Sequence, residues 1–206
     1  MTTAVWSRPE DERAGTELLV MIHGYGSSEE RVLPLFEALP ANVTGVALRG
    51  HFDVGANYGW FLLDAFLASD FADVVSSANK VFAWLDPVLA SGKFSGTSLL
   101  GFSQGMAMAT TLIRLRPTAF RAAVGLSGFV LENELLTLTD ELDGTLPFFW
   151  GRDAADVVIH QDAVDYAADW LEAHTRLTAR TYPGMGHNIG HDEIRDVGIF
   201  LKTYLG

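Results

Sequence analysis

Apolar and polar residues follow one another along this chain in blocks that predict buried strands and amphipathic helices in turn. The nearly continuous apolar run at 17–23 is typical of a strand that is buried on both faces of a parallel sheet. Apolar residues at helical spacing predict a helix over 70–90. The same patterns predict strands near 5–6, at the run that ends at residue 100, and at 43–48, 122–126, 147–150 and 177–182, a short helix within 133–143, and helices at 163–174 and 191–205. This alternation predicts an α/β fold with a mostly parallel central sheet and helices on both faces.

Two segments are less regular. A helix is expected from Ser27 or Ser28 to Ala38, with irregular first turns because Pro34 falls within it. Segment 49–69 is rich in glycine and aromatic residues, and we expect it to be a long loop. Loops of this length are uncommon in compact domains unless they have a function.

Residues 101–105 read Gly-Phe-Ser-Gln-Gly, a G-x-S-x-G pentapeptide between an apolar run and a run of small and apolar residues. In the order strand, sharp turn, buried helix, this motif forms a nucleophile elbow that exposes the serine hydroxyl above the sheet. The flanking glycines avoid clashes with the neighbouring strand and helix. A chance match is the alternative in a chain with 20 glycines, but the context argues against it. We therefore expect Ser103 to be a nucleophile.

A serine nucleophile of this kind needs a carboxylate and then a histidine later in the chain. His187 lies in a glycine-rich loop after the last predicted strand, where it can act as general base; the alternative is a surface histidine. His191 competes with it, but the start of the final helix suits a surface or capping role. For the acid, position leaves Asp153 and Asp156 open, because both follow the strand at 147–150.

Acyl transfer also requires donors for the oxyanion. One expected donor is the backbone N–H of Gln104, the residue after the nucleophile. The other is the backbone N–H of Tyr25, which lies in the loop His-Gly-Tyr-Gly at 23–26 after the first buried strand. Glycines on both sides of Tyr25 let its amide approach the carbon under attack.

Composition excludes several classes of function. The 206 residues predict a single domain over 1–206, and the net charge of −12 argues against nucleic acid and anionic membrane surfaces as partners. The absence of cysteine excludes disulfides, thiolate metal sites and a cysteine nucleophile, and fits a cytoplasmic location. Residues 1–14 lack the apolar core of a signal peptide, and no apolar run is long enough for a membrane span, so no integral membrane association is expected.

Taken together, these motifs resemble the phospholipase/carboxylesterase family of α/β-hydrolases, which includes bacterial carboxylesterases and acyl-protein thioesterases. The resemblance covers nearly the whole chain. It rests on the oxyanion strand and loop at 20–26, the Trp-Phe pair at 60–61, the Gly-Phe-Ser-Gln-Gly motif, the Asp-x-Val-Ile stretch at 156–159 and the histidine stretch at 182–187. It selects Asp156 over Asp153 as the acid. The family's proline after that stretch is His160 here.

By this resemblance, the fold is an α/β-hydrolase fold and the reaction is hydrolysis of a small-molecule carboxylic ester through an acyl-enzyme, with no cofactor and no metal. Short- to medium-chain acyl esters are the expected substrates, and the sequence does not distinguish them from thioesters or lactones. An alternative is a hydrolase-fold receptor that binds a small ligand and turns over slowly. The sequence also leaves the oligomeric state open, a homodimer included.

Aromatic residues between Phe52 and Phe66, together with the residues after the strand at 122–126, are expected to lie near the elbow. We expect them to line an acyl pocket, although about half of such aromatics could be ordinary core. The expected pocket residues are Phe52, Tyr58, Trp60, Phe61 and Phe129. No large cap domain is expected, because the longest insertion, 127–146, is too short to form one.

Overall fold

The computed structural model describes residues 3–64, 67, 69–138 and 140–206 of the chain. Within these residues, seven strands form one sheet in the order β1-β3-β2-β6-β7-β8-β9. Only β1 runs antiparallel to its neighbour, β3, and the other pairs are parallel. The strands are β1 (Ala4–Trp6), β2 (Glu17–Ile22), β3 (Val43–Leu48), β6 (Gly96–Phe102), β7 (Ala123–Leu126), β8 (Pro147–Arg152) and β9 (Arg176–Thr181). The predicted mostly parallel sheet is thus confirmed.

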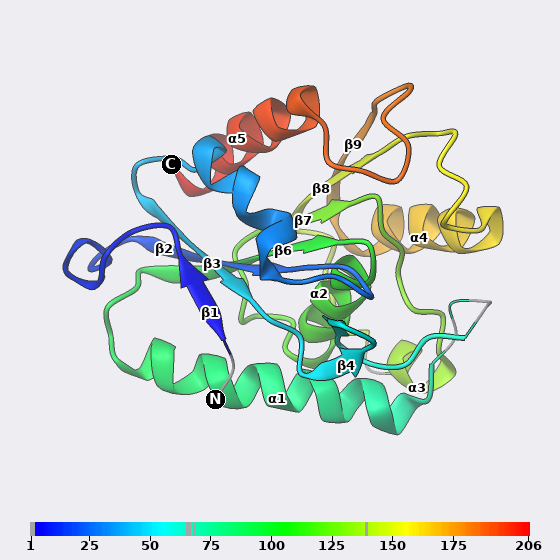
Figure 1. Ribbon diagram of the computed structural model, residues 1–206, viewed down its shortest axis with the longest axis horizontal. Helices are drawn as coiled ribbons and strands as arrows, with labels where there is room; N and C mark the ends of the chain where they lie inside the picture. Colours follow the sequence, from blue (N-terminus) through cyan, green and yellow to red (C-terminus); the bar gives the residue numbers. More distant parts are fainter. Residues whose placement is uncertain (1–2, 65–66, 68, 139) are drawn as a thin grey trace.

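Helices cover both faces of this sheet, with α1 on one side and α5 on the other (Figure 1). The helices are α1 (Phe71–Ala90), α2 (Gln104–Leu115), α3 (Glu134–Thr137), α4 (Gln161–His174) and α5 (His191–Leu205), with 3₁₀ segments η1 (Glu10–Glu12) and η2 (Glu29–Ala38). Among the described residues, the connection between β7 and β8 holds only the short helix α3, and no large cap covers the sheet. No described helix combines the length and apolar character that a membrane span requires.

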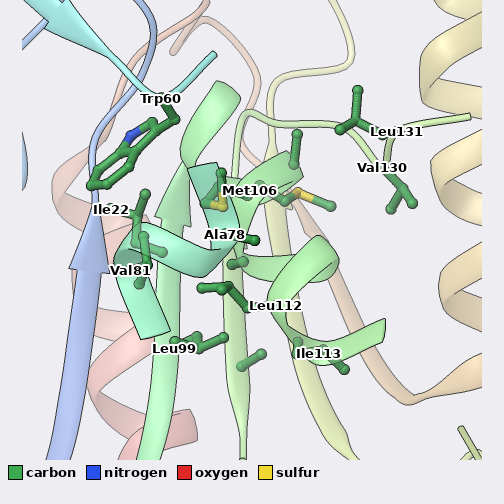
Figure 2. Packing of buried hydrophobic residues seen from close by; sticks show 14 of the residues in the cluster. Ile22, Trp60, Ala78, Val81, Leu99, Met106, Leu112, Ile113, Val130 and Leu131 are labelled. Carbon is green, nitrogen blue, oxygen red and sulfur yellow. The ribbon is translucent and has the colours of Figure 1, made fainter. Parts of the chain in front are cut away.

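The core lies in two layers because side chains alternate across each strand. In β2, Leu18, Val20 and Ile22 face the layer that α1, α2 and α4 cover, whereas Leu19 and Met21 face the layer under η2 and α5. Figure 2 shows the first layer, where side chains of α1, α2 and β6 meet in one cluster. Each fully buried Leu, Ile or Val side chain contributes about 1.5–3 kcal/mol to folding.

The order of the strands reverses beside β2. The chain passes from β2 to β3 on one side and then returns to β6 on the other side of β2. In parallel sheets, ligands bind in the crevice outside the carboxyl ends of the strands at such a switch point. The loop after β2 and the elbow after β6 therefore meet where a site is expected.

Two local predictions need correction. Segment 49–69 is not a plain loop, because β4 (Phe52–Val54) and β5 (Asn57–Gly59) pair in it as a small antiparallel hairpin. The helix predicted up to Ala38 is a 3₁₀ helix rather than an α-helix, and it contains Pro34, which cannot donate a backbone hydrogen bond. Phe66 in the aromatic segment lies outside the described residues.

Candidate active site

Ser103 occupies a strained corner between β6 and α2. Its backbone has φ 55° and ψ −120°, outside the regions that residues with side chains favour, which costs about 1–3 kcal/mol. Glycines make this corner possible. A β-carbon on Gly101 would lie 2.2 Å from the carbonyl carbon of Gly105, and one on Gly105 would lie 2.0 Å from the carbonyl oxygen of Ile22. The spacing of the pentapeptide is therefore dictated by the close packing of strand, turn and helix.

The structure brings together the side chains of Ser103, Asp156 and His187 from three separate loops. His187 Nε2 lies 3.0 Å from Ser103 Oγ, and His187 Nδ1 lies 2.7 Å from Asp156 Oδ2. An ionised carboxylate only accepts hydrogen bonds, so Nδ1 donates and Nε2 is left to accept from the serine hydroxyl. The Asp156 side chain is 1% exposed and that of His187 is 18% exposed, so within this pair the imidazole reaches solvent and the carboxylate does not.

The two aspartates after β8 have different partners. Asp156 Oδ1 accepts from the amide of Val158 at 2.8 Å, and its other oxygen faces the imidazole. Asp153 instead accepts from the amides of Ala155, at 2.9 Å, and Gly186, at 2.8 Å. These backbone hydrogen bonds hold the pKa of the Asp153 carboxyl below its usual range. Asp153 therefore ties the acid loop to the histidine loop, while Asp156 contacts the histidine itself.

The loop that carries His187 is anchored through its neighbour Asn188. Ser127 Oγ donates to the Asn188 carbonyl at 3.2 Å, and the Arg31 guanidinium donates to the Asn188 side chain. His191, the competing imidazole, is exposed at the first residue of α5. Within the described part of the chain, no group of three or more His, Asp or Glu side chains is arranged to hold a metal ion.

The two expected oxyanion donors lie on segments that meet at Ser103. Gln104 is the first residue of α2, and amides in the first turn of a helix have no partner within the helix. Tyr25 lies in the loop after β2, where a β-carbon on Gly24 would stand 3.1 Å from Ser103 Cβ. The loop and the elbow are thus in close contact.

The Gln104 side chain has a role that the sequence did not reveal. It is fully buried, and its Oε1 accepts from the amide of Trp60 at 3.0 Å. Its Nε2 donates to the carbonyl oxygen of Phe61 at 2.7 Å. The glutamine of the elbow therefore fixes the chain that follows the β4–β5 hairpin.

His23 was also missed as a functional side chain, although it belongs to the loop motif. Its Nδ1 donates to the Gly24 carbonyl at 2.7 Å, and its Nε2 accepts from the amide of Gly50 at 2.9 Å. Its own carbonyl accepts from Trp60 Nε1 at 2.8 Å. Burial lowers the pKa of this imidazole, so the neutral form with Nδ1 protonated is favoured. His23 therefore fixes the backbone of the loop that carries Tyr25.

A partly buried ion pair secures the hairpin beside this loop. Arg49 makes two contacts with the Glu29 carboxylate, at 2.8 Å and 2.5 Å, and its guanidinium lies 4.7 Å from the centre of the Tyr58 ring. The Arg49 side chain lowers the pKa of the Glu29 carboxyl. Tyr58 also exchanges two backbone hydrogen bonds with Ser27, at 3.0 Å and 2.8 Å. These contacts hold the hairpin next to the Tyr25 loop.

The five aromatic residues expected in an acyl pocket are not equivalent. Trp60, Phe61 and Phe129 are at most 2% exposed and belong to the main core layer. Phe52 and Tyr58 are half-buried on the hairpin. Phe129 also lines a surface hollow of about 460 Å³. Their role in binding substrate stays a prediction.

This hollow lies beside the elbow. A β-carbon on Gly128, the residue before Phe129, would stand 2.8 Å from the carbonyl oxygen of Ser103. His160 also lines it and precedes α4 with φ −60°, an angle at which the family's proline would fit as well. The hollow is lined by Leu67, Phe129, Val130, Glu132, His160, Gln161, Asp162, Ala163 and Tyr166.

Comparison with known proteins gives one consistent result. A family model described as Phospholipase/Carboxylesterase matches residues 8–205. A probable carboxylesterase SOBER1-like protein of Arabidopsis thaliana is 27% identical over 163 residues, which are 72% of this chain and 62% of that protein. Acyl-protein thioesterase 1 of Candida albicans is 32% identical over 112 residues, 50% of this chain and 47% of that protein. The chain thus matches about half to three fifths of the length of these relatives. The crystal structure of esterase PE8 superposes with a TM-score of 0.82 at 25% identity, over 99% of both chains.

Proposed function

This chain belongs to the phospholipase/carboxylesterase family, and we propose on that premise that it is a serine hydrolase of carboxylic esters. In this proposal Ser103 is the nucleophile, His187 the general acid and base, and Asp156 the acid that orients the imidazole. The single observation that carries it is the pair of contacts that His187 makes, to Ser103 Oγ at 3.0 Å and to Asp156 Oδ2 at 2.7 Å.

Acylation follows from these contacts. Ser103 Oγ attacks the ester carbonyl carbon while His187 Nε2 takes the hydroxyl proton. The oxygen of the carbonyl becomes negative, and the amides of Gln104 and Tyr25 donate to it. The imidazolium then gives its proton to the leaving alcohol oxygen as the carbon–oxygen bond breaks. The products of this half-reaction are the free alcohol and an ester between the acyl group and Ser103.

Deacylation repeats the sequence with water. His187 takes a proton from the water, whose oxygen attacks the acyl carbon, and the proton then passes to Ser103 Oγ as that bond breaks. Asp156 stays ionised throughout and stabilises the imidazolium through Nδ1. Each turnover therefore consumes one ester and one water and releases one alcohol and one carboxylic acid, and this chemistry requires no cofactor or metal.

The expected substrates are short- to medium-chain acyl esters. The hollow beside the elbow supports this, because Phe129, Val130 and Leu67 form an apolar part of its lining that could receive an acyl chain. Thioesters undergo the same two steps, and the names of the Candida albicans and Arabidopsis thaliana relatives cover both leaving groups.

Labelling and turnover together test the proposal. A fluorophosphonate should label Ser103, and p-nitrophenyl acetate and butyrate should be hydrolysed with many turnovers per enzyme. Rapid labelling with negligible turnover on every ester and thioester would instead favour a receptor with a hydrolase fold. Absence of labelling would contradict an activated serine at residue 103.

A further inference from the structure

Arg114, near the end of α2, has a fully buried guanidinium. Its side chain is 0% exposed, and that of its partner Asp140 is 5% exposed. The pair is bidentate, with Nε to Oδ1 at 2.7 Å and Nη2 to Oδ2 at 3.0 Å. Arg114 also donates from Nη1 to the Leu131 carbonyl at 2.9 Å and from Nη2 to Thr137 Oγ1 at 3.3 Å. Burying such a pair seldom adds net stability, since desolvation offsets the attraction, so its value here lies in the geometry it fixes.

The same ion pair reaches α4. Trp170 Nε1 donates to Asp140 Oδ2 at 3.0 Å, and the Trp170 ring lies 5.4 Å from the Arg114 guanidinium. Three elements are thus joined at one point: the helix that begins after Ser103, the segment 131–140 and α4.

Two of these elements line the hollow beside the elbow: segment 131–140 contributes Glu132, and α4 contributes four residues of its first two turns, whereas α2 lies behind them. Val130, which lines the hollow, directly precedes Leu131, whose carbonyl accepts from Arg114. Tyr166 of α4 also lines the hollow and lies one helical turn before Trp170. Figure 2 shows Val130 and Leu131 in the same cluster as Met106 and Ile113 of α2.

Segment 132–141 places few of its described side chains in the core. Among its described residues only Leu136 is buried, whereas Leu135 is 50% exposed and Leu138 is 82% exposed. Apolar packing by itself therefore holds little of this segment. The hydrogen bonds of Arg114 and Asp140 supply the contacts that fix its position.

We propose that Arg114 is a positioning residue that sets the width of the hollow beside Ser103 and thereby limits the length of acyl chain that the enzyme accepts. This inference rests on the proposed ester hydrolysis. Arg114 touches none of Ser103, Asp156 and His187 in the contacts described above, so loss of its ion pair should change which chain is bound and leave the bond-breaking steps intact. A wall that is free to move outward would bind short chains more weakly and admit longer ones.

The experiment compares chain-length profiles in the wild type, Asp140→Asn and Trp170→Phe. Asp140→Asn keeps the shape of the side chain but removes its charge, and Trp170→Phe removes only one donor and keeps most of the packing. The control is Arg116→Met, which breaks the exposed Arg116–Asp86 pair at the end of the same helix. For each protein, kcat and KM are measured with p-nitrophenyl acetate, butyrate, octanoate and dodecanoate, and the melting temperature is recorded.

In Asp140→Asn we expect KM for butyrate to rise about fivefold and the dodecanoate-to-butyrate ratio of kcat/KM to rise about fivefold, with kcat for acetate within about twofold of wild type. Trp170→Phe should shift in the same direction by less, and Arg116→Met should keep the wild-type profile. An unchanged chain-length ratio in either folded variant would overturn the proposal. If Asp140→Asn does not fold, Trp170→Phe decides. Absence of ester turnover in the wild type would be a failure of the proposed function, which this design separates from a failure of the Arg114 proposal.

Discussion

Gly105 packs so tightly against the end of β2 that a β-carbon on it would stand 2.0 Å from the carbonyl oxygen of Ile22. Real β-carbons do not come this close to backbone, so an alanine at residue 105 must push α2 away from β2. We expect Gly105→Ala to cost about 1–3 kcal/mol of unfolding free energy. It should also lower kcat for p-nitrophenyl butyrate, because the shift displaces Ser103. Urea unfolding and steady-state kinetics measure the two effects.

Gly92→Ala is a matched control for this substitution. Gly92 has φ 67° at the end of α1, and nothing lies within 4 Å of the position of its β-carbon. The control should lose about 1–2 kcal/mol through backbone strain alone, and its kcat should not change. Wild-type kcat in Gly105→Ala would contradict the packing argument at the elbow.

Substitutions at Ser103 should reveal both the loss of the nucleophile and the strain of the backbone at this residue. Ser103→Ala and Ser103→Gly should each lower kcat by about 10⁴-fold or more. Glycine adopts a φ of 55° with less strain than alanine. The free energy of unfolding of Ser103→Gly should therefore exceed that of Ser103→Ala by about 1 kcal/mol. Denaturant unfolding of the two inactive variants measures this difference. Equal stabilities would mean that the elbow holds no strain at this residue.

Substituting the two aspartates after β8 should affect different properties of the protein. Asp156→Asn should lower kcat by about 10⁴-fold, because an amide no longer selects the tautomer that the serine needs. Its stability should change little. Asp153→Asn should lower the melting temperature, because asparagine replaces one of the two accepting oxygens with an NH2 group, which cannot accept from Ala155 or Gly186. Its kcat should fall less than that of Asp156→Asn, and the reverse order would exchange the two roles.

Asp153 also predicts a dependence of stability on pH. Its pKa is lowered in the folded protein relative to the unfolded value of about 3.9. Its contribution is therefore fully present above the unfolded pKa and is lost as the pH falls through the folded pKa. When the pH is lowered below about 4, we expect the melting temperature of the wild type to fall by more than that of Asp153→Asn. Parallel melting curves of the two proteins would exclude this linkage.

The sequence was most informative where one pattern has one physical solution. A buried apolar run such as that of β2 fits only a strand covered on both faces, and the pentapeptide around Ser103 fits only a sharp turn. It was less informative about the β4–β5 hairpin. That hairpin has short, half-exposed strands, and what holds it is its contact with the Tyr25 loop rather than an apolar pattern.

The candidate site shows the same division. Ser103 and His187 could be selected from the order of motifs, but Asp153 and Asp156 lie three residues apart in one loop, and only the resemblance to a family chose between them. The buried contacts of the Gln104 side chain join segments more than 40 residues apart in sequence, so no local sequence pattern predicts them. Trp60 and Phe61 belong to the core although they follow the hairpin beside the site. Composition alone does not distinguish aromatic residues of the core from those that line a pocket.

Glu193, in the first turn of α5, is a buried acid that the sequence analysis did not single out. Its side chain is 0% exposed, and neither of its oxygens has a hydrogen-bond partner among the described residues. Burial raises the pKa of its carboxyl to about 8. Nearby Tyr182 stays neutral, because burial and Asp196 raise the pKa of its hydroxyl.

The raised pKa of Glu193 predicts that stability falls as the pH rises. Below the unfolded pKa of about 4.3, the carboxyl is protonated in both states and has no effect on pH dependence. Between that value and about 8, the unfolded chain has released a proton that the folded protein still holds, so each rise in pH favours unfolding. Above about 8 the penalty stops growing. Glu193→Gln stays uncharged and should therefore melt at a higher temperature than the wild type, by a margin that widens from pH 5 to pH 8. The exposed Glu172→Gln serves as the control and should follow the wild type. A constant difference between Glu193→Gln and the wild type at every pH would mean that this carboxyl does not hold its proton in the folded protein.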